Sequence, residues 1–429
     1  MNQPLPNHPA VTRLEWAAHL LFLVSLVFSL RAGSSMAAGL LVITGLGYNW
    51  SQHRSLYHAR LRDPFFIACC LYGLGLLLSL CWHPPGADDW RQLQLKSALV
   101  AVPLSFCCSG FINANTTRRL LAVLTGLLVV AAAYCLVMAA LSGHSSHFFY
   151  HELVKPLKQH AVYFSLLVCF TLFFLCESAA ERDWLVSKPL HGAALLFLLV
   201  FLVLLSSKLV ISFFLIYLVF FALKTVPAVN HRRPLTWGIV AILISATALL
   251  LITNNPISRR FRELTAGDPS LFRQERFDPS VYFNGLQFRL MQWKLVPGML
   301  DKHDAWMTGV GAGRSQSLLA GEYQDRGMYA GTTGTGDPGY LLYNTHNQLL
   351  ETLLKYGLPG AALFVLLCLS LVLKAWKEKT RVFSFAVALL LLYTCFEALL
   401  ETQYGIMIFT YFPFLFAAWK KTGVSSADR

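Results

Sequence analysis

The sequence predicts an all-α integral membrane protein with about twelve transmembrane helices and one large extramembrane loop that contains short helices. Of its 429 residues, 56% are hydrophobic and only 13% are charged, too little polar surface to cover a water-soluble globule of this size. The apolar runs are about twenty residues long, the length at which a helix crosses a bilayer. The alternating pattern of a membrane barrel is absent, so helices are favoured.

The predicted spans follow the apolar runs, and the first run, which begins near Leu14, lacks a signal-peptide cleavage pattern and is expected to be retained. We predict three regions: 1–253 with the first nine spans, the loop 254–356, and 357–429 with the last three spans and the C-terminal segment. The predicted spans are 14–31, 33–49, 64–82, 96–112, 119–141, 159–177, 188–205, 208–224, 236–253, 357–375, 381–399 and 404–419.

The formal net charge of +13 indicates membrane topology rather than nucleic-acid binding, because Lys and Arg recur between apolar runs instead of gathering in one domain. They mark every second loop, for example at Arg62, Arg118 and Lys377. By the positive-inside rule, both termini are predicted to be cytoplasmic and the large loop to lie outside. The ten cysteines fall within or beside apolar runs, so neither a disulfide framework nor a zinc site is expected.

The large loop contains a predicted amphipathic helix in the run LQFRLMQWKLVPGML. Arg289 and Trp293 are four residues apart and share one face of it, so the guanidinium could project into a site. The alternative is that both residues anchor the helix at the membrane interface. The apolar face of this predicted helix consists of Phe288, Met291, Leu295 and Met299.

The loop ends with the run Tyr-Asn-Thr-His-Asn, which places His346 where the loop meets the tenth predicted span. A histidine near its unperturbed pKa can accept a proton from a hydroxyl at neutral pH, as an alcohol nucleophile requires. The alternative is a structural histidine that binds nearby carbonyl groups. We predict that His346 is a general base.

Five further polar residues are predicted to lie at the same side of the membrane. His160 and Tyr163 open the sixth span, Lys208 lies at the outer turn before the eighth, and Glu397 and Glu401 are one helical turn apart at the outer end of the eleventh. Each charge alone could simply extend to the bilayer boundary. Their common side favours a shared site.

The same distribution separates an enzyme from a transporter. An ion-coupled transporter is expected to carry ionisable residues at mid-membrane depth, and the predicted spans carry none there. An outward-facing enzyme needs cations for a phosphate leaving group and a base for the acceptor. The sequence therefore favours the enzyme.

The layout of spans and the motifs of the large loop resemble the bacterial O-antigen ligase and polymerase superfamily. His160-x-x-Tyr163 and Glu397-x-x-x-Glu401 are similar to secondary patterns in some members. The ligases usually carry an Arg where this sequence has Lys208, and a Lys can hold a phosphate only as a point charge. The loop pattern of Arg, Trp, Pro, Gly-rich turn, His-Asn and Gly-x-x-Gly corresponds to Arg289, Trp293, Pro297, Gly309, Gly311, His346, Asn347, Gly357 and Gly360.

The resemblance implies transfer of a glycan from undecaprenyl diphosphate to a hydroxyl at the periplasmic face of the bacterial inner membrane, without metal, nucleotide or other cofactor. Arg289 and Lys208 would bind the diphosphate, and Arg289 and His346 would be the catalytic residues. Ligation to the lipid A-core in lipopolysaccharide biosynthesis is favoured; repeat-unit polymerisation, glycan transfer to protein and transport stay open. The expected substrate-binding residues are Lys208, His160, Tyr163, Trp293, Asn347, Glu397 and Glu401.

Overall fold

The computed structural model describes residues 9–49, 60–83, 85–184, 186–225, 253, 256–262, 269–332 and 337–419. Within these ranges the chain is helical, apart from loops and one isolated bridge between Thr332 and Asp337. The helices are α1 (Pro9–Val27), α2 (Arg31–Thr44), α5 (Pro64–Ser79), α6 (Ala87–Lys96), α7 (Ala98–Cys108), α8 (Ala114–Leu141), α9 (Tyr150–Val154), α10 (Ala161–Ala180), α11 (Lys188–Leu204), α12 (Lys208–Thr225), α14 (Pro256–Arg262), α15 (Gly285–Lys302), α16 (Ala312–Asp325), α17 (Gln348–Glu378), α18 (Arg381–Thr394) and α19 (Gln403–Ala417), with short turns η1 (Gly45–Asn49), η2 (Ser145–Phe148), η3 (Lys155–Leu157), η4 (Pro269–Arg273) and η5 (Leu399–Glu401).

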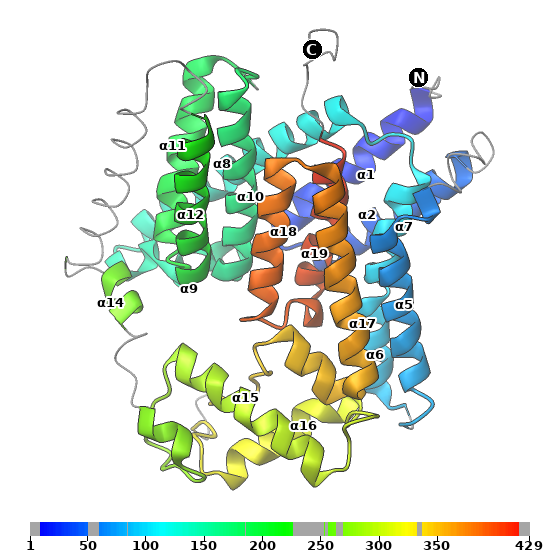
Figure 1. Cartoon of the computed structure of the whole chain (residues 1–429). Helices are drawn as coiled ribbons and strands as arrows, with labels where there is room; N and C mark the ends of the chain where they lie inside the picture. The colour runs from blue at the N-terminus through cyan, green and yellow to red at the C-terminus, as the bar shows by residue number, and fades with distance from the viewer. Residues whose placement is uncertain are drawn as a thin grey trace.

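The long helices pack side by side as a bundle, and α15 and α16 lie together at one end of it (Figure 1). A described helix overlaps every predicted span except 236–253, of which all residues but the last lie outside the described part of the chain. By length and composition, α8, α10, α12 and α17 are apolar enough to cross a membrane, and α5, α11, α18 and α19 are shorter apolar helices. The all-helical prediction is confirmed for the described residues. The number of twelve spans and the three predicted regions stay predictions.

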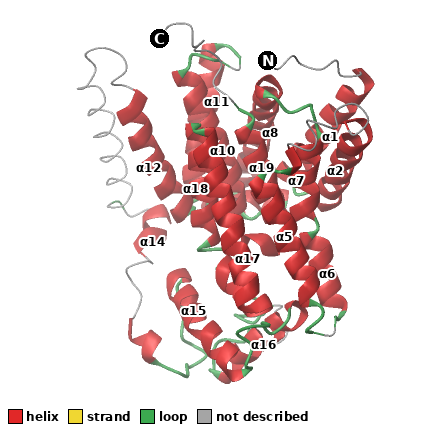
Figure 2. Cartoon of the chain, turned by 45° about the vertical axis from the view of Figure 1, so that its right-hand side comes forward, coloured by secondary structure: helices red, strands yellow, loops and turns green. Residues whose placement is uncertain are grey.

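Helix α10 lies at the centre of its part of the bundle, with α8, α11, α12 and α18 packed around it (Figure 2). Every residue from Phe164 to Ser178 is buried. Helix α5, by contrast, exposes Leu74 and Leu78 by 50% and 49% while Tyr72 is fully buried. Large exposed leucines on the outside of a bundle are expected where lipid replaces water as the solvent. The apolar helices thus support a membrane protein.

The loop helices form a hydrophobic core of their own. In α15, the four apolar residues Phe288, Met291, Leu295 and Met299 are at most 4% exposed. They pack with residues of α16, including Tyr323. The predicted helix and its apolar face are therefore confirmed, but the face packs against protein within this second core.

Helix α17 begins before its predicted start, because a kink at Gly357 joins two helical pieces. Gly357 has φ +64°, and Pro359 lacks the N–H that would bind the Lys355 carbonyl. The segment before α16 satisfies the freed groups: Val310 N donates to Leu354 O (2.8 Å) and Gly311 N to Lys355 O (3.1 Å). The kink sets the direction of the first piece of α17, which follows His346.

The predicted eleventh span is too long at its end. Helix α18 stops at Thr394, so Glu397 and Glu401 do not lie on one helix but in the following segment, which contains η5. Donors from other elements bind the carbonyl groups here: Asn347 Nδ2 donates to Cys395 O (3.1 Å) and Arg289 Nε to Phe396 O (2.8 Å). These bonds replace the helical ones and hold the segment against α15 and α17.

Candidate active site

Three segments that are distant in the sequence bring Arg289, His346 and Glu397 together. Arg289 Nη2 donates to Glu397 Oε1 (2.6 Å), and His346 Nδ1 lies 2.9 Å from Glu397 Oε2. The side chains are 22%, 20% and 15% exposed, respectively. One carboxylate therefore binds both predicted catalytic residues in a partly buried setting, where charge-assisted hydrogen bonds are strong.

Helix caps place two members of this cluster. Asn284 caps α15 by accepting from Gln287 N (2.9 Å), and Gln287 Oε1 accepts from Asn284 N in return, which fixes the turn that carries Arg289. Asn347, the residue after His346, caps α17 by accepting from Leu350 N (3.0 Å). Asn347 also donates to Cys395 O, so a predicted substrate-binding residue here binds the backbone.

The electrostatics of the cluster keep Glu397 ionised. Burial alone would raise the pKa of its carboxyl, but the hydrogen bond with His346 and the charges of His346, Arg289 and His160 outweigh burial, so the pKa lies below its ordinary value of 4.5. An ionised carboxylate can only accept, so the proton in the bond to His346 belongs to Nδ1. In the neutral imidazole, Nε2 then carries a free lone pair, as a general base requires.

The guanidinium of Arg289 has more hydrogen-bond donors than its protein acceptors use. A guanidinium carries five N–H groups. Three of them donate to protein acceptors: Nε to Phe396 O, Nη1 to Gly285 O (2.8 Å) and Nη2 to Glu397. Two N–H groups, one on each terminal nitrogen, are left over by these bonds and could bind a phosphate oxygen.

His160 and Tyr163 lie at the start of α10, close to the same cluster. The His160 ring stacks edge-on with His151 (4.3 Å between centroids) and with Tyr163 (5.4 Å). Tyr163 Oη accepts from Thr402 Oγ1 (3.3 Å). His160 and Tyr163 thus belong to a group of aromatic rings at the start of α10.

The remaining predicted residues have separate settings. Trp293 is 37% exposed, one turn beyond Arg289 on α15. Lys208 is the first residue of α12 and is partly buried. Glu401 lies in a different, buried ion cluster with Lys96 and Lys355. No group of three His, Cys, Asp or Glu side chains in the described part of the chain is arranged to hold a metal ion.

Sequence reasoning missed four residues behind the site: Thr345, Glu351, Lys355 and Lys96. All are at most 4% exposed. The spacing of Glu351 and Lys355 at i and i+4, before an apolar span, is a signal for an ion pair that was available in the sequence.

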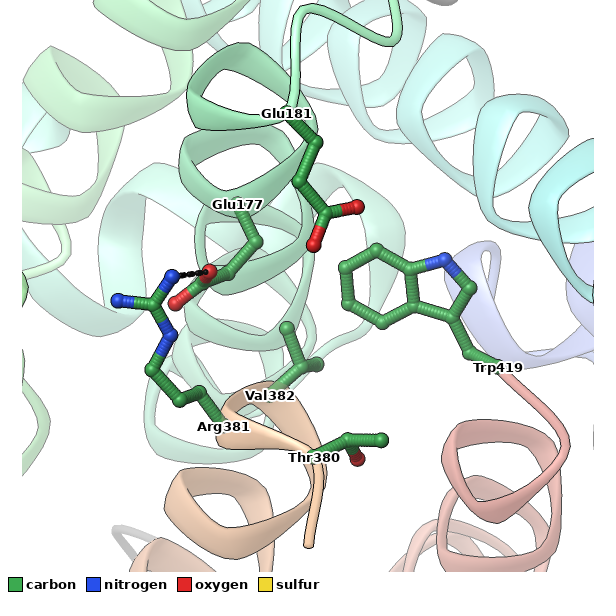
Figure 3. Close-up of a pocket in the computed structure, with 6 residues that line it drawn as sticks. All are labelled: Glu177, Glu181, Thr380, Arg381, Val382 and Trp419. Carbon is green, nitrogen blue, oxygen red and sulfur yellow. Dashed lines mark ion pairs between the residues drawn. The ribbon is translucent and has the colours of Figure 1, made fainter. Parts of the chain in front are cut away.

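A small cavity lies near the start of α18, and Arg381, Glu177 and Trp419 are among the residues that line it (Figure 3). Arg381 Nη2 forms an ion pair with Glu177 (2.8 Å). Since α18 has 14 residues, this cavity is about 20 Å from the His346 cluster at its other end. Its volume of about 10 Å³ is near the minimum for one water molecule, too small for a sugar or a diphosphate.

Part of the chain matches the model of a known protein family. A family model described as O-antigen ligase matches residues 193–365, less than half of the chain. The matched segment includes Lys208, Arg289 and His346, whereas Glu397 and His160 lie outside it. No curated protein matches the chain. Over residues 193–365, the match confirms the resemblance of the chain to the O-antigen ligase and polymerase superfamily.

Proposed function

We propose that this protein is an O-antigen ligase, which transfers a glycan from undecaprenyl diphosphate to a hydroxyl of the lipid A-core at the periplasmic face of the inner membrane. The family match supports a function of the O-antigen ligase or polymerase type, with a lipid-linked glycan and an acceptor as substrates. The observation that supports the chemistry most directly is the cluster in which Glu397 binds both His346 and Arg289.

In the proposed reaction, His346 Nε2 takes the proton of the acceptor hydroxyl, and the hydroxyl oxygen attacks the anomeric carbon of the donor sugar. The bond from that carbon to the diphosphate oxygen breaks, and its electron pair leaves with the diphosphate. Arg289 and Lys208 stabilise the negative charge that develops there. The products are the extended acceptor and undecaprenyl diphosphate, and His346 returns its proton to solvent.

The other residues of the cluster have supporting roles in this proposal. Glu397 orients the His346 ring and fixes its tautomer, as the carboxylate of a catalytic triad does. His160, Tyr163 and Trp293 line the approaches to the cluster and contact substrate. No step requires a metal, because cationic side chains provide the charge that a metal would otherwise supply.

The test is a silver-stained lipopolysaccharide gel, with an O-antigen immunoblot, of the source organism lacking this gene. Ligase activity predicts bare core together with polymeric antigen that accumulates on undecaprenyl diphosphate. Core that bears a single repeat unit would identify a polymerase instead. An unchanged ladder would exclude both and leave protein glycosylation and transport.

Complementation then tests the site. We expect wild-type protein to restore the ladder and His346→Ala to fail while its level in the membrane is normal. His303→Ala is the matched control, since His303 is exposed on the same loop at the end of α15. A full ladder with His346→Ala would refute the assigned base.

A further inference from the structure

A buried ion network lies directly behind the candidate active site. Lys96 Nζ binds Glu401 Oε1 (2.8 Å), Lys355 Nζ also binds Glu401, and Lys355 pairs with Glu351 (2.9 Å). The four side chains are between 1% and 6% exposed. Two positive and two negative charges balance, as burial at this depth requires.

One end of the network holds the residue before His346. Glu351 Oε2 accepts from Thr345 N (3.1 Å) and from Thr345 Oγ1 (2.8 Å). Thr345 is fully buried, and its hydroxyl also lies 3.0 Å from Asn347 O. Because peptide geometry leaves few free torsions between neighbours, fixing Thr345 on this side restricts His346.

The other end holds the segment that carries Glu397. Glu401 follows Glu397 by four residues, and both of its oxygens bind buried lysines. Gln348 connects the two ends, since its Nε2 donates to Glu401 Oε1 (3.2 Å) and its Oε1 accepts from Leu400 N (2.6 Å). The two residues of the His346–Glu397 hydrogen bond are therefore fixed from a single network.

The backbone of His346 shows why such support is needed. His346 has φ +45°, in the left-handed region that is unfavourable for a residue with a side chain. Such a conformation persists where surrounding contacts over-determine it, and it is common at functional sites. Here His346 N donates to Asn344 Oδ1 (2.9 Å), and the residues on both sides are bound by the network and by the α17 cap.

We propose that Lys96, Glu351, Lys355 and Glu401 are positioning residues, which act through Thr345 and Leu400 to hold His346 Nδ1 against Glu397. None of the four touches substrate in this proposal. For Glu401, the positioning role replaces the substrate-binding role expected from the sequence. The proposal also gives α6 a part in catalysis, because it contributes Lys96. It rests on the proposed function of His346. Buried ion pairs are weak evidence for stability but can enforce one defined geometry, which is the role assigned here.

The primary test compares Thr345→Val, which keeps the shape but loses the hydroxyl, with Thr345→Ser, which keeps the hydroxyl. Purified protein in liposomes is assayed for glycan transfer from a lipid-diphosphate donor. We expect Thr345→Val to lower kcat about 10- to 100-fold with an unchanged KM for the donor, since small misplacements of a catalytic group cost this much. Thr345→Ser should restore most of kcat. Thr117→Val, at an equally buried threonine of α8, is the control and should match the wild type.

A kcat for Thr345→Val near that of the wild type would overturn the proposal, as would a loss that Thr345→Ser does not recover. If Thr345→Val is inactive because it is misfolded, Lys96 provides a second test. Lys96→Met leaves one buried negative charge of the network without a partner. Lys96→Met combined with Glu401→Gln restores the charge balance but removes the ion pairs of residue 401 with Lys96 and Lys355. Positioning predicts that the double variant regains Tm but not kcat, whereas recovery of both would mean a purely structural network.

Failure of this inference is distinguishable from failure of the proposed function. If His346→Ala retains transfer, the proposed function of the site fails and the network has no catalytic geometry to support. If His346→Ala is inactive but Thr345→Val is fully active, only the positioning role fails.

Discussion

Replacing Glu397 by glutamine changes one oxygen to a nitrogen at the point where Arg289 and His346 meet. Arg289 can only donate, so the amide oxygen of the new side chain must turn toward it. The amide nitrogen then faces His346 Nδ1 and donates to it. This reverses the tautomer: the ring proton moves to Nε2, and the lone pair that is proposed to take the acceptor proton is lost.

The size of the effect follows from what is removed. The two hydrogen bonds of Glu397 are 2.6 Å and 2.9 Å long and the side chain is 15% exposed, so solvent screens them little. A positioned general base contributes about 10²- to 10⁴-fold to a rate, equivalent to about 3–5 kcal/mol in the barrier. We expect Glu397→Gln to lower kcat by a factor in this range.

The assay is glycan transfer by purified protein in liposomes at several pH values. Because the pKa of the Glu397 carboxyl is below its ordinary 4.5, the wild-type side chain is ionised throughout the usual assay range, so the loss does not depend on titration of Glu397 itself. Glu397→Asp keeps the charge and is the control, with a smaller loss. A Glu397→Gln rate within about threefold of the wild type, less than one well-made charge-assisted hydrogen bond is worth, would refute the tautomer argument.

Three further predictions concern charge. Lys208→Gln should raise the KM for the lipid-diphosphate donor about tenfold while Lys208→Arg retains binding, and an unchanged KM in Lys208→Gln would contradict the assignment. Chelation with EDTA should leave kcat unchanged within about twofold, because Arg289 and Lys208 take the place of a metal; loss of activity that Mg²⁺ restores would contradict this. Burial raises the pKa of the Glu401 carboxyl, but Lys355 and Lys96 outweigh burial and bring that pKa below 4.5. The ionised carboxylate therefore stabilises the fold fully above pH 4.5, and this stabilisation is lost as the pH falls further. The fall in Tm caused by Glu401→Gln should therefore shrink on acidification, and a larger fall at low pH would contradict this sign.

Much of the fold was predictable from apolar runs, because lipid requires helices of a defined length. The start of α17 was not, since Gly357 and Pro359 are typical of a helix boundary and the donors that stabilise the kink come from residues 310 and 311. The end of α18 was not either, because Asn347 and Arg289 bind its terminal carbonyls from elsewhere in the chain. In both cases, hydrogen bonds from residues distant in the sequence determine where the helix begins or ends.

The site was predictable in its residue types but not in its pairings. Arg289 and His346 follow from the sequence pattern of the loop. Glu397, however, meets Arg289 across 108 positions and His346 across 51, and a single sequence holds no information on such pairings. The sequence also grouped Glu397 with Glu401, whereas the structure separates them into two clusters.

That separation has a physical reason. In a setting of low dielectric, an unpaired charge is costly, so a buried cation must be paired with an anion of the protein before a diphosphate binds. Lys96 and Lys355 are fully engaged by carboxylates, and a ligand could recruit them only by breaking a buried pair. Arg289 is different, because its planar group can keep its bond to Glu397 and still offer two N–H groups to a phosphate oxygen. An arginine can therefore be paired at rest and still bind an anion, which supports the proposal that Arg289, and neither buried lysine, binds the diphosphate.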